Sequence, residues 1–338
     1  MASRYNRQEL IHKIGKEGQQ KISLGKVVII GCGALGTHIA NNLVRAGVGK
    51  IKIIDRDFIE MHNLQRQILF NEEDIKKDLP KAIAAKEHLT KINSEIEIIS
   101  EVADVNFTNI EGFIKGFDAV VDGTDNFLIR YLLNEACDKL SIPWVYGGGI
   151  STSGMTRTII PGKTPCFLCQ FPKQPPSELI LTCDTSGVLS SSIAVSAAIQ
   201  SLEILKILIG KFDELNTDLL SFDIWDLNFK KLEVRKNSEC DVCVRKKYDL
   251  LSGIKGITVS NLCGQNSIQI IDLSAQAPDF SVLSEKIKNL TDVKANKFLL
   301  KFSISGKDVT IFKDGRTIIK GITNEKEAKT FYDKYIGG

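Results

Sequence analysis

The chain of 338 residues carries almost no net charge, because 44 Lys and Arg residues stand against 41 Asp and Glu residues, which leaves +3. So small an excess argues against a nucleic-acid partner. The sequence also lacks internal repeats and low-complexity runs. Its content of 43% apolar and 25% charged residues excludes disordered, collagen-like and small disulfide-rich proteins. The length leaves room for two domains.

A long uninterrupted apolar run is also missing. The longest apolar stretch, Val188–Ile209, is broken by several serines, Gln200, Glu203 and Lys206, so it predicts a helix of a soluble protein and no membrane contact. The first ten residues contain no apolar segment of the kind found in secretory signals, so we expect a cytoplasmic protein. In that reducing compartment the eight cysteines are better suited to metal binding or thiol chemistry than to disulfides.

The first 150 residues alternate between strand-like and helix-like patterns, which predicts a parallel sheet with crossover helices. The expected strands are Val27–Ile30, Ile51–Ile54, Ile96–Ser100, Ala119–Val121 and Trp144–Tyr146, and the expected helices are Ala34–Ala46, Lys81–Leu89 and Ile129–Leu140. After Gly147–Gly149, strands at Thr156–Ile160 and Ser221–Arg235 predict an antiparallel extension. The predicted fold class is therefore α/β, with a Rossmann-like mixed sheet.

The last 80 residues show a different pattern. A linker is expected at Asp249–Thr258, between a first domain over residues 1–248 and a small α+β domain over residues 259–338. The smaller domain is predicted from strands at Lys297–Ser303, Val309–Phe312 and Thr317–Lys320 and a helix at Glu325–Tyr335. The final residues, Gly337 and Gly338, are expected to terminate that helix.

Three glycines, Gly31, Gly33 and Gly36, form the pattern G-x-G-x-x-G between the first strand and the first crossover helix. Such a loop lets the backbone approach a phosphate, and the helix N-terminus adds N–H donors. Asp55 ends the second strand, 19 residues after Gly36, where a carboxylate can accept hydrogen bonds from ribose hydroxyls. By itself this loop favours NAD or FAD.

Further polar side chains follow Asp55, and with the glycines they make up the expected nucleotide site: Asp57, Asn63, Gln65, Arg66 and Lys81. Hydride transfer needs no such cluster, whereas a phosphoryl group under attack does, because charge develops on its oxygens. Asp125 follows the fourth strand at its carboxyl end and is a candidate magnesium ligand. The alternative role for Asp122 or Asp125 is to cap the next helix.

Two C-x-x-C pairs, Cys166/Cys169 and Cys240/Cys243, stand 70 residues apart. Two pairs supply the four thiolates of a structural zinc site, whereas a redox dithiol needs only one pair. Cys32, Cys137 and Cys263 are expected to be packing residues, and the four histidines lack metal-binding spacing. Cys183 precedes a predicted helix, whose dipole can lower a thiol pKa while Asp184 opposes this, so a catalytic role stays open for it.

Taken together, these motifs resemble the ThiF/MoeB/HesA family, the bacterial relatives of ubiquitin-activating enzymes. The matching segments lie in the family order over about residues 4–245: Arg4–Gln8, GCGALG, Asp55–Asp57, Asn63–Gln67, Pro80-Lys81, Asp122–Asn126 and both cysteine pairs. The C-terminal segment lies outside this common core. It is similar to extensions on some family members, and the match implies no role for it.

The resemblance implies a reaction and a set of partners. Family members use ATP and Mg²⁺ to adenylate the C-terminal glycine carboxylate of a ubiquitin-like sulfur-carrier protein, which releases pyrophosphate and prepares sulfur transfer from a donor protein. By position, Asp55 would hold the ribose, Asn63, Arg66 and Lys81 the phosphates, and Asp125 the magnesium ion. Arg7 would reach the triphosphate of a partner subunit, which implies a functional homodimer. Cys183 lies where some members bond to the carrier.

Three other hypotheses compete with carrier adenylation. An NAD-dependent oxidoreductase would leave Arg66, Lys81 and the cysteine pairs unexplained. A catalytically idle scaffold would not need each motif cation and carboxylate. A family member could instead adenylate another carboxylate, such as a peptide C-terminus. The sequence does not decide between a carrier of the thiamine pathway and one of the molybdopterin pathway.

Overall fold

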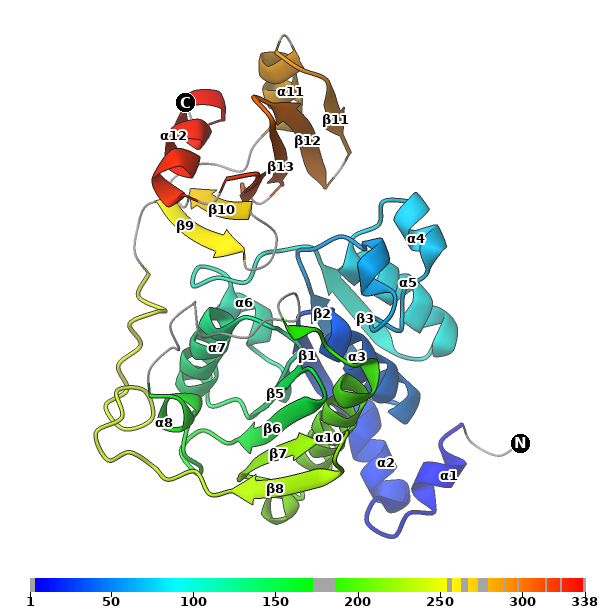
Figure 1. The fold of residues 1–338 in the computed structure, drawn as a ribbon. Helices are drawn as coiled ribbons and strands as arrows, with labels where there is room; N and C mark the ends of the chain where they lie inside the picture. Colours follow the sequence, from blue (N-terminus) through cyan, green and yellow to red (C-terminus); the bar gives the residue numbers. More distant parts are fainter. Residues whose placement is uncertain are drawn as a thin grey trace. The chain divides into compact units, whose positions relative to one another are not determined.

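The computed structural model describes residues 4–172, 186–253, 257–262, 267–272, 279–288, 290–296, 298–313, 315–322 and 324–336. The chain divides into two compact units, Met1–Gly253 and Ile254–Gly338 (Figure 1). The division falls inside the segment Asp249–Thr258, where the linker was predicted.

An eight-stranded sheet with the order β3-β2-β1-β4-β5-β6-β7-β8 forms the centre of the first unit. Its strands are β1 (Lys26–Ile30), β2 (Lys50–Ile54), β3 (Glu97–Glu101), β4 (Ala119–Asp122), β5 (Trp144–Ile150), β6 (Ser153–Ile159), β7 (Leu219–Asp223) and β8 (Asn228–Leu232). In this order, the neighbouring strands β3, β2, β1, β4 and β5 pair in parallel. The neighbouring strands β5, β6, β7 and β8 pair antiparallel. The predicted mixed sheet is thus confirmed.

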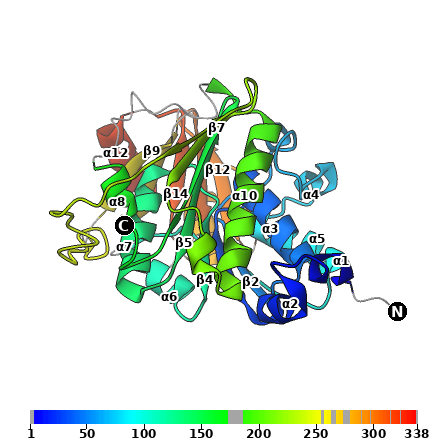
Figure 2. The ribbon, with the colours of Figure 1, turned by 90° about the horizontal axis from the view of Figure 1, so that it is seen from below.

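Helices cover both faces of this sheet. They are α1 (Asn6–Glu9), α2 (Gly15–Leu24), α3 (Ala34–Ala46), η1 (Met61–Asn63), α4 (Glu72–Lys76), α5 (Lys81–Ile92), α6 (Ile110–Ile114), α7 (Phe127–Leu140), α8 (Phe167–Gln170), α10 (Ser190–Ile209) and η3 (Phe212–Glu214). In Figure 2, α3, α5 and α10 lie on one side of the strands and α6 and α7 on the other. Alternate residues of β1 point to opposite faces of the sheet. Val27 and Ile29 pack in the core beneath α3 and α10, and Val28 and Ile30 pack in the core beneath α6 and α7. Burial on both faces explains why β1 is a continuous apolar run.

Two segments of the antiparallel extension differ from the prediction. The glycines expected to end a strand at Tyr146 instead continue β5 to Ile150. A Cβ on Gly147 would lie 2.2 Å from the Gln200 side chain, and one on Gly149 would lie 2.7 Å from Ile193, so only glycine lets α10 pack this closely. The run Ser221–Arg235, read as one strand, contains the end of β7, a turn and all of β8.

Helix α10 is long and apolar enough to cross a membrane by length and composition, but half of its most apolar window is buried inside the structure. It packs against α3 and against β5 and β6. The residues buried along it include Ser192, Ser196 and Gln200, which hydrogen-bond to the chain around them. Within this unit α10 is therefore a core helix.

The second unit is a six-stranded antiparallel sheet with the order β11-β12-β13-β14-β10-β9. Its elements are β9 (Ile257–Leu262), β10 (Ser267–Asp272), α11 (Phe280–Lys288), β11 (Val293–Ala295), β12 (Leu299–Ile304), β13 (Lys307–Phe312), β14 (Thr317–Lys320) and α12 (Glu325–Tyr335). Leu283 and Ile287 of α11 and Phe331 of α12 share one core with the sheet. This is the α+β unit that the sequence predicted, although β9, β10, β11 and α11 were not foreseen. Gly337 and Gly338 lie outside the described residues.

Candidate nucleotide and metal sites

The glycine loop joins β1 to α3 and packs against the loop after β4. Gly31 has a φ of +88°, in the region that favours glycine, and a Cβ there would lie 2.8 Å from the Gly123 carbonyl oxygen. A Cβ on Gly36 would lie 2.0 Å from the Gly31 carbonyl oxygen. At Gly33 the nearest atom to such a Cβ is Nε2 of Gln67, at 3.8 Å. Two of the three predicted glycines therefore permit close backbone packing, and Gly33 leaves space beside the loop.

Asp55, at the carboxyl end of β2, ties this loop to the turn that follows. Its Oδ2 accepts a hydrogen bond from the amide of Cys32 at 2.6 Å, and its Oδ1 accepts one from the amide of Asp57 at 2.7 Å. Burial raises the pKa of Asp55, and the nearby ammonium of Lys81 opposes that rise. The carboxylate that the sequence assigned to ribose binding thus also fixes the glycine loop.

Lys81 is the first residue of α5, and only 7% of its surface is exposed. Its Nζ lies 3.3 Å from Oδ2 of Asp57, and its amide donates to the Asp57 carbonyl at 2.9 Å. Burial alone would lower the pKa of Lys81, but the carboxylates of Asp57 and Asp55 more than offset this and the pKa is raised. Lys81 is therefore a preformed buried ammonium beside the glycine loop.

The segment after β2 carries the remaining predicted phosphate ligands. Glu60 and Asn63 cap η1 reciprocally, and the buried Asn63 accepts the amide of Glu60 at 3.1 Å. Arg66 is half-buried, and its Nη1 donates to the carbonyl of His62 at 2.9 Å. Gln65 is exposed. Within the described part of the chain Arg66 pairs with no carboxylate, so its positive charge is available to a phosphate.

Gln67 is a site candidate that sequence reasoning named only as part of a motif. It is 4% exposed, its Nε2 lies beside Gly33, and its buried Oε1 has no hydrogen-bond partner among the described residues. A buried amide oxygen of this kind is costly unless something donates to it. Its place beside the glycine loop could not be read from the sequence, because the two segments are brought together only by the fold.

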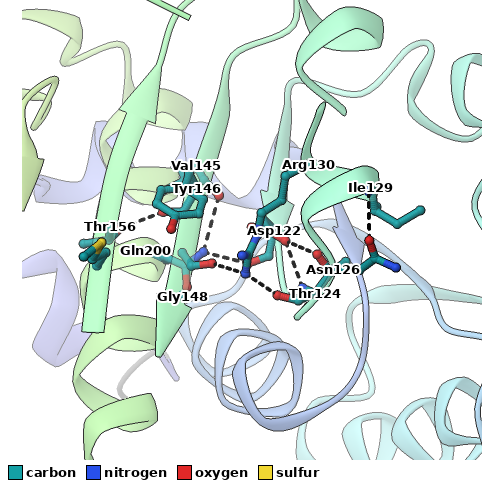
Figure 3. Close-up of polar contacts among 12 residues, drawn as sticks. Asp122, Thr124, Asn126, Ile129, Arg130, Val145, Tyr146, Gly148, Thr156 and Gln200 are labelled. Carbon is teal, nitrogen blue, oxygen red and sulfur yellow. Dashed lines mark hydrogen bonds and ion pairs between the residues drawn. The ribbon is translucent and has the colours of Figure 1, made fainter. Parts of the chain in front are cut away.

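A buried ion pair supports the loop after β4 (Figure 3). Oδ2 of Asp122 accepts from Nε of Arg130 at 2.8 Å, and Oδ1 accepts from the amide and the hydroxyl of Thr124 at 2.9 and 2.7 Å. Nη2 of Arg130 donates to the carbonyls of Thr124 and Gly147 at 2.6 and 3.0 Å. The guanidinium thus joins the end of β4, the loop after it and β5.

Gln200 of α10 strengthens this support from the opposite layer. The parallel pairing of β4 with β5 ends at Val121 and Val145. Just beyond this point Nε2 of Gln200 donates to the carbonyls of Asp122 and Val145, at 2.8 and 3.3 Å (Figure 3). Side chains from α7 and α10 therefore replace the missing ladder bonds where the two strands separate.

Asp125 lies exposed on the loop that this network supports. Its charge raises the pKa values of Arg56, Lys81 and Arg130, which places it within electrostatic reach of all three. The residue that caps α7 is Asn126, whose side chain accepts the amides of Leu128 and Ile129. Neither Asp122 nor Asp125 caps that helix.

Arg7 lies far from the glycine loop of its own chain. The ring of Tyr5 packs against Gly47, and Nε2 of Gln8 donates to the carbonyl of Ala46, so α1 is fixed at the C-terminal end of α3. The glycine loop is at the other end of α3, whose 13 residues span about 20 Å. The structure thus separates Arg7, which is exposed, from the other predicted ligands.

The four cysteines of the two C-x-x-C pairs converge, as predicted. Their sulfur atoms all lie within 4.8 Å of one another, with Cys166–Cys240 and Cys169–Cys243 separations of 3.6 Å and a Cys166–Cys169 separation of 3.9 Å. Four thiolates around zinc at about 2.3 Å would be about 3.8 Å apart, so the cluster has the size of a tetrahedral zinc site. The cysteines form no disulfide.

The other four cysteines divide into two cases. Cys32 and Cys137 are fully buried, and burial raises the pKa of each thiol, as expected for packing residues. Cys183 and Cys263 lie outside the described residues.

Comparison with known proteins identifies the class. Residues 5–242 match the ThiF family. The chain is 39% identical to the sulfur carrier protein ThiS adenylyltransferase of Bacillus subtilis (strain 168), over the whole of both chains. It is 35% identical to the sulfur carrier protein adenylyltransferase of Thermus thermophilus, over 71% of this chain and 90% of that one. The crystal structure of E. coli MccB with ATP is similar at a TM-score of 0.62 and 26% identity, over 71% of this chain and 74% of that one.

The glycine loop, the buried lysine and the paired cysteines thus belong to an enzyme that uses ATP to transfer an adenylyl group. The chain is a member of the ThiF family of adenylyltransferases.

Proposed function

We propose that this enzyme adenylates the C-terminal glycine of a ubiquitin-like sulfur-carrier protein. A carboxylate oxygen of the carrier forms a bond to the α-phosphorus of ATP, the bond from that phosphorus to the β-bridging oxygen breaks, and pyrophosphate leaves. The carrier keeps the adenylyl group as a mixed anhydride, ready for attack by a sulfur donor. The observation that carries this proposal is the buried ammonium of Lys81 beside a glycine loop, together with the guanidinium of Arg66, which pairs with no carboxylate among the described residues.

The roles of the side chains follow from charge and position. Lys81 and Arg66 would stabilise the charge that develops on the phosphate oxygens and on the leaving pyrophosphate. Asn63 and Gln65 would add polar contacts to the phosphates, and Asp55 would accept from the ribose hydroxyls with its remaining lone pairs. Gly31, Gly33 and Gly36 would let the backbone approach the nucleotide. Asp57 would keep the ammonium of Lys81 charged and in place.

The carboxylate of Asp125 is suited to bind a magnesium ion. It is an exposed carboxylate on a braced loop, within electrostatic reach of the cation Lys81. Mg²⁺ prefers one or two carboxylates together with phosphate oxygens. When bound, the ion would neutralise charge on the triphosphate, while Arg130 and Gln200 keep the supporting loop fixed.

Arg7 would act in the active site of a second subunit. In its own chain α1 is fixed about 20 Å from the glycine loop, so Arg7 can serve a triphosphate only across an interface. This predicts a functional homodimer. Cys183, which lies outside the described residues, would attack the acyl carbon of the adenylated carrier, so that a thioester forms and AMP leaves.

The relatives support one choice of carrier. The Bacillus subtilis enzyme matches this chain over its whole length, including the second unit, and it is named for ThiS. This favours a thiamine-pathway carrier over a molybdopterin-pathway one. The peptide alternative keeps a specific observation in its favour, because the E. coli MccB structures include complexes with MccA and with ATP.

ATP–pyrophosphate exchange tests the proposal directly. Exchange should require a carrier with an intact terminal glycine, and it should be fastest with a ThiS-like carrier. The control is the same carrier without its last glycine, which should support no exchange. If a short peptide supports exchange and neither type of carrier does, the peptide alternative is right.

We further propose that the four-cysteine cluster holds a structural zinc ion. The purified protein should contain about one zinc per chain. Cys166→Ser or Cys243→Ser should lose the metal and unfold at a lower temperature, because structural zinc binding contributes to folding free energy. A wild-type protein that is stable and metal-free would contradict this proposal.

A further inference from the structure

A fully buried arginine lies next to the cysteine cluster. Arg157 of β6 has no exposed surface. Its Nε donates to the carbonyl of Thr217 at 2.7 Å, its Nη2 to the carbonyl of Pro165 at 2.7 Å, and its Nη1 to Oε1 of Gln170 at 3.3 Å. These contacts satisfy N–H groups, but they bring no negative charge. A buried cation without a counter-charge is strongly destabilising.

Two other arginines of this unit, the buried Arg130 and the half-buried Arg56, have carboxylate partners. Arg130 pairs with Asp122 at 2.8 Å, and Arg56 pairs with Asp104 at 2.6 Å. In the part of the chain that the structure describes, no carboxylate pairs with Arg157 within 4.0 Å. No ion pair within the described residues therefore supplies the counter-charge of Arg157.

Thiols are the groups that act most strongly on Arg157. Burial lowers the pKa of its guanidinium to about 10, and the groups that oppose this are first Cys166 and Cys169. Asp218 has the next largest effect, and then Cys243. The electrostatic neighbourhood of Arg157 is thus mainly the cysteine cluster.

The hydrogen bonds of Arg157 also bracket the first cysteine pair. Pro165 immediately precedes Cys166, and Gln170 immediately follows Cys169. One guanidinium therefore holds the chain on both sides of the C-x-x-C turn, while its Nε anchors it to the segment before β7.

We propose that Arg157 is the counter-charge of the zinc–thiolate centre and the residue that positions its first cysteine pair. Four thiolates and one Zn²⁺ carry a net charge of about −2, which a buried guanidinium partly neutralises. The inference rests on the proposed zinc site and is independent of the adenylation chemistry. Arg157 and the metal then stabilise each other, because each leaves a buried, uncompensated charge when the other is removed.

The rate of zinc transfer to excess chelator tests this in the full-length protein. Arg157→Gln keeps N–H donors but removes the charge, whereas Arg157→Lys keeps the charge and removes the planar fork. Loss of a residue that supports metal ligands typically weakens binding about 10- to 100-fold, so zinc should leave Arg157→Gln at least about 10-fold faster than wild type. Arg157→Lys should release zinc several-fold more slowly than Arg157→Gln.

The matched control is Arg235→Gln, since the side chain of Arg235 is 85% exposed and pairs only with Glu233 at 3.5 Å in the described structure. It should release zinc at the wild-type rate. The counter-charge role of Arg157 would be refuted if Arg157→Lys and Arg157→Gln released zinc at equal rates. It would also be refuted if Arg157→Gln released zinc at the wild-type rate. If Arg157→Gln does not fold while Arg157→Lys folds and binds zinc, a positive charge at position 157 is required, as proposed. If neither variant folds, the charge is not what matters and the proposal is refuted. Wild-type protein without zinc would instead refute the metal proposal itself.

Discussion

At the scale of single residues, the cations around the glycine loop are of two kinds. Lys81 and Arg130 are buried and have carboxylate partners, so their charges are already partly neutralised. Arg66 pairs with no carboxylate among the described residues and is half-buried. We infer that Arg66 contributes most of the free positive charge available to the triphosphate.

Substitution of Arg66 should therefore affect catalysis and leave the fold intact. Arg66→Ala should slow pyrophosphate exchange by about 10²–10³-fold, as is typical when one preorganised donor to developing charge is removed. Thermal unfolding should stay near that of wild type, because the guanidinium makes a single described hydrogen bond, to His62. Normal exchange in this variant would refute the assignment.

Asp125 should show its role through magnesium. Asp125→Asn keeps the size and polarity of the side chain but removes its charge, so the Mg²⁺ concentration for half-maximal exchange should rise by about tenfold or more. Asp118→Asn is a suitable control. Asp118 immediately precedes β4, whereas Asp125 follows it, and the Asp118 carboxylate accepts a hydrogen bond from the Lys26 amide. Unchanged magnesium dependence in Asp125→Asn would exclude this ligand.

The sequence predicted residue types for the candidate site, but not their contacts. The residues that follow the second strand led us to propose Asp55, Arg66 and Lys81. It could not show that both oxygens of Asp55 bind backbone amides, or that Gln67 lies beside Gly33. Such contacts depend on loop geometry, which periodicity does not encode.

At the scale of the elements, prediction succeeded where burial imposes a clear period. Helix Ala34–Ala46 and helix Glu325–Tyr335 were predicted with the bounds that the structure gives. It failed at the glycines of β5, because glycine ordinarily interrupts a strand and the close approach of α10 is a tertiary effect. Short helices such as α6 contain too few residues to show a period.

The ion pair between Arg130 of α7 and Asp122 of β4 should be essential to the stability of the loop that carries Asp125. Arg130→Met would leave Asp122 buried without its partner, and breaking such a pair costs about 3–5 kcal/mol. Urea unfolding should report this loss. The control is Lys139→Met on the same helix, whose ion pair with Glu111 is partly exposed and should contribute about 0–1 kcal/mol. Equal stability of the two variants would contradict a bracing role for Arg130.

At the scale of the whole molecule, the chain combines a family domain with a second unit that has its own core. The antiparallel sheet and helices α11 and α12 enclose buried residues such as Ile268, Phe302 and Ile319. The match to the Bacillus subtilis enzyme extends over this unit, whereas the match to the ThiF family ends at residue 242. The second unit is therefore shared with a relative but lies outside the family domain that holds the candidate nucleotide site.

The position of Arg7 gives a test of assembly. Because α1 is fixed at the far end of α3 by Tyr5 and Gln8, an active site completed by Arg7 needs a second chain. Arg7→Ala and Arg66→Ala homodimers should each be inactive. When the two are mixed, a heterodimer contains one site with both arginines intact, so pyrophosphate exchange should recover to at most about one quarter of the wild-type rate, since half of randomly mixed dimers have one good site of two. If subunits exchange, as shown by mass measurement of tagged chains, and no activity returns, then Arg7 does not act across the interface. Recovery in the mixture, with none in either parent protein, is a result that a monomeric active site cannot produce.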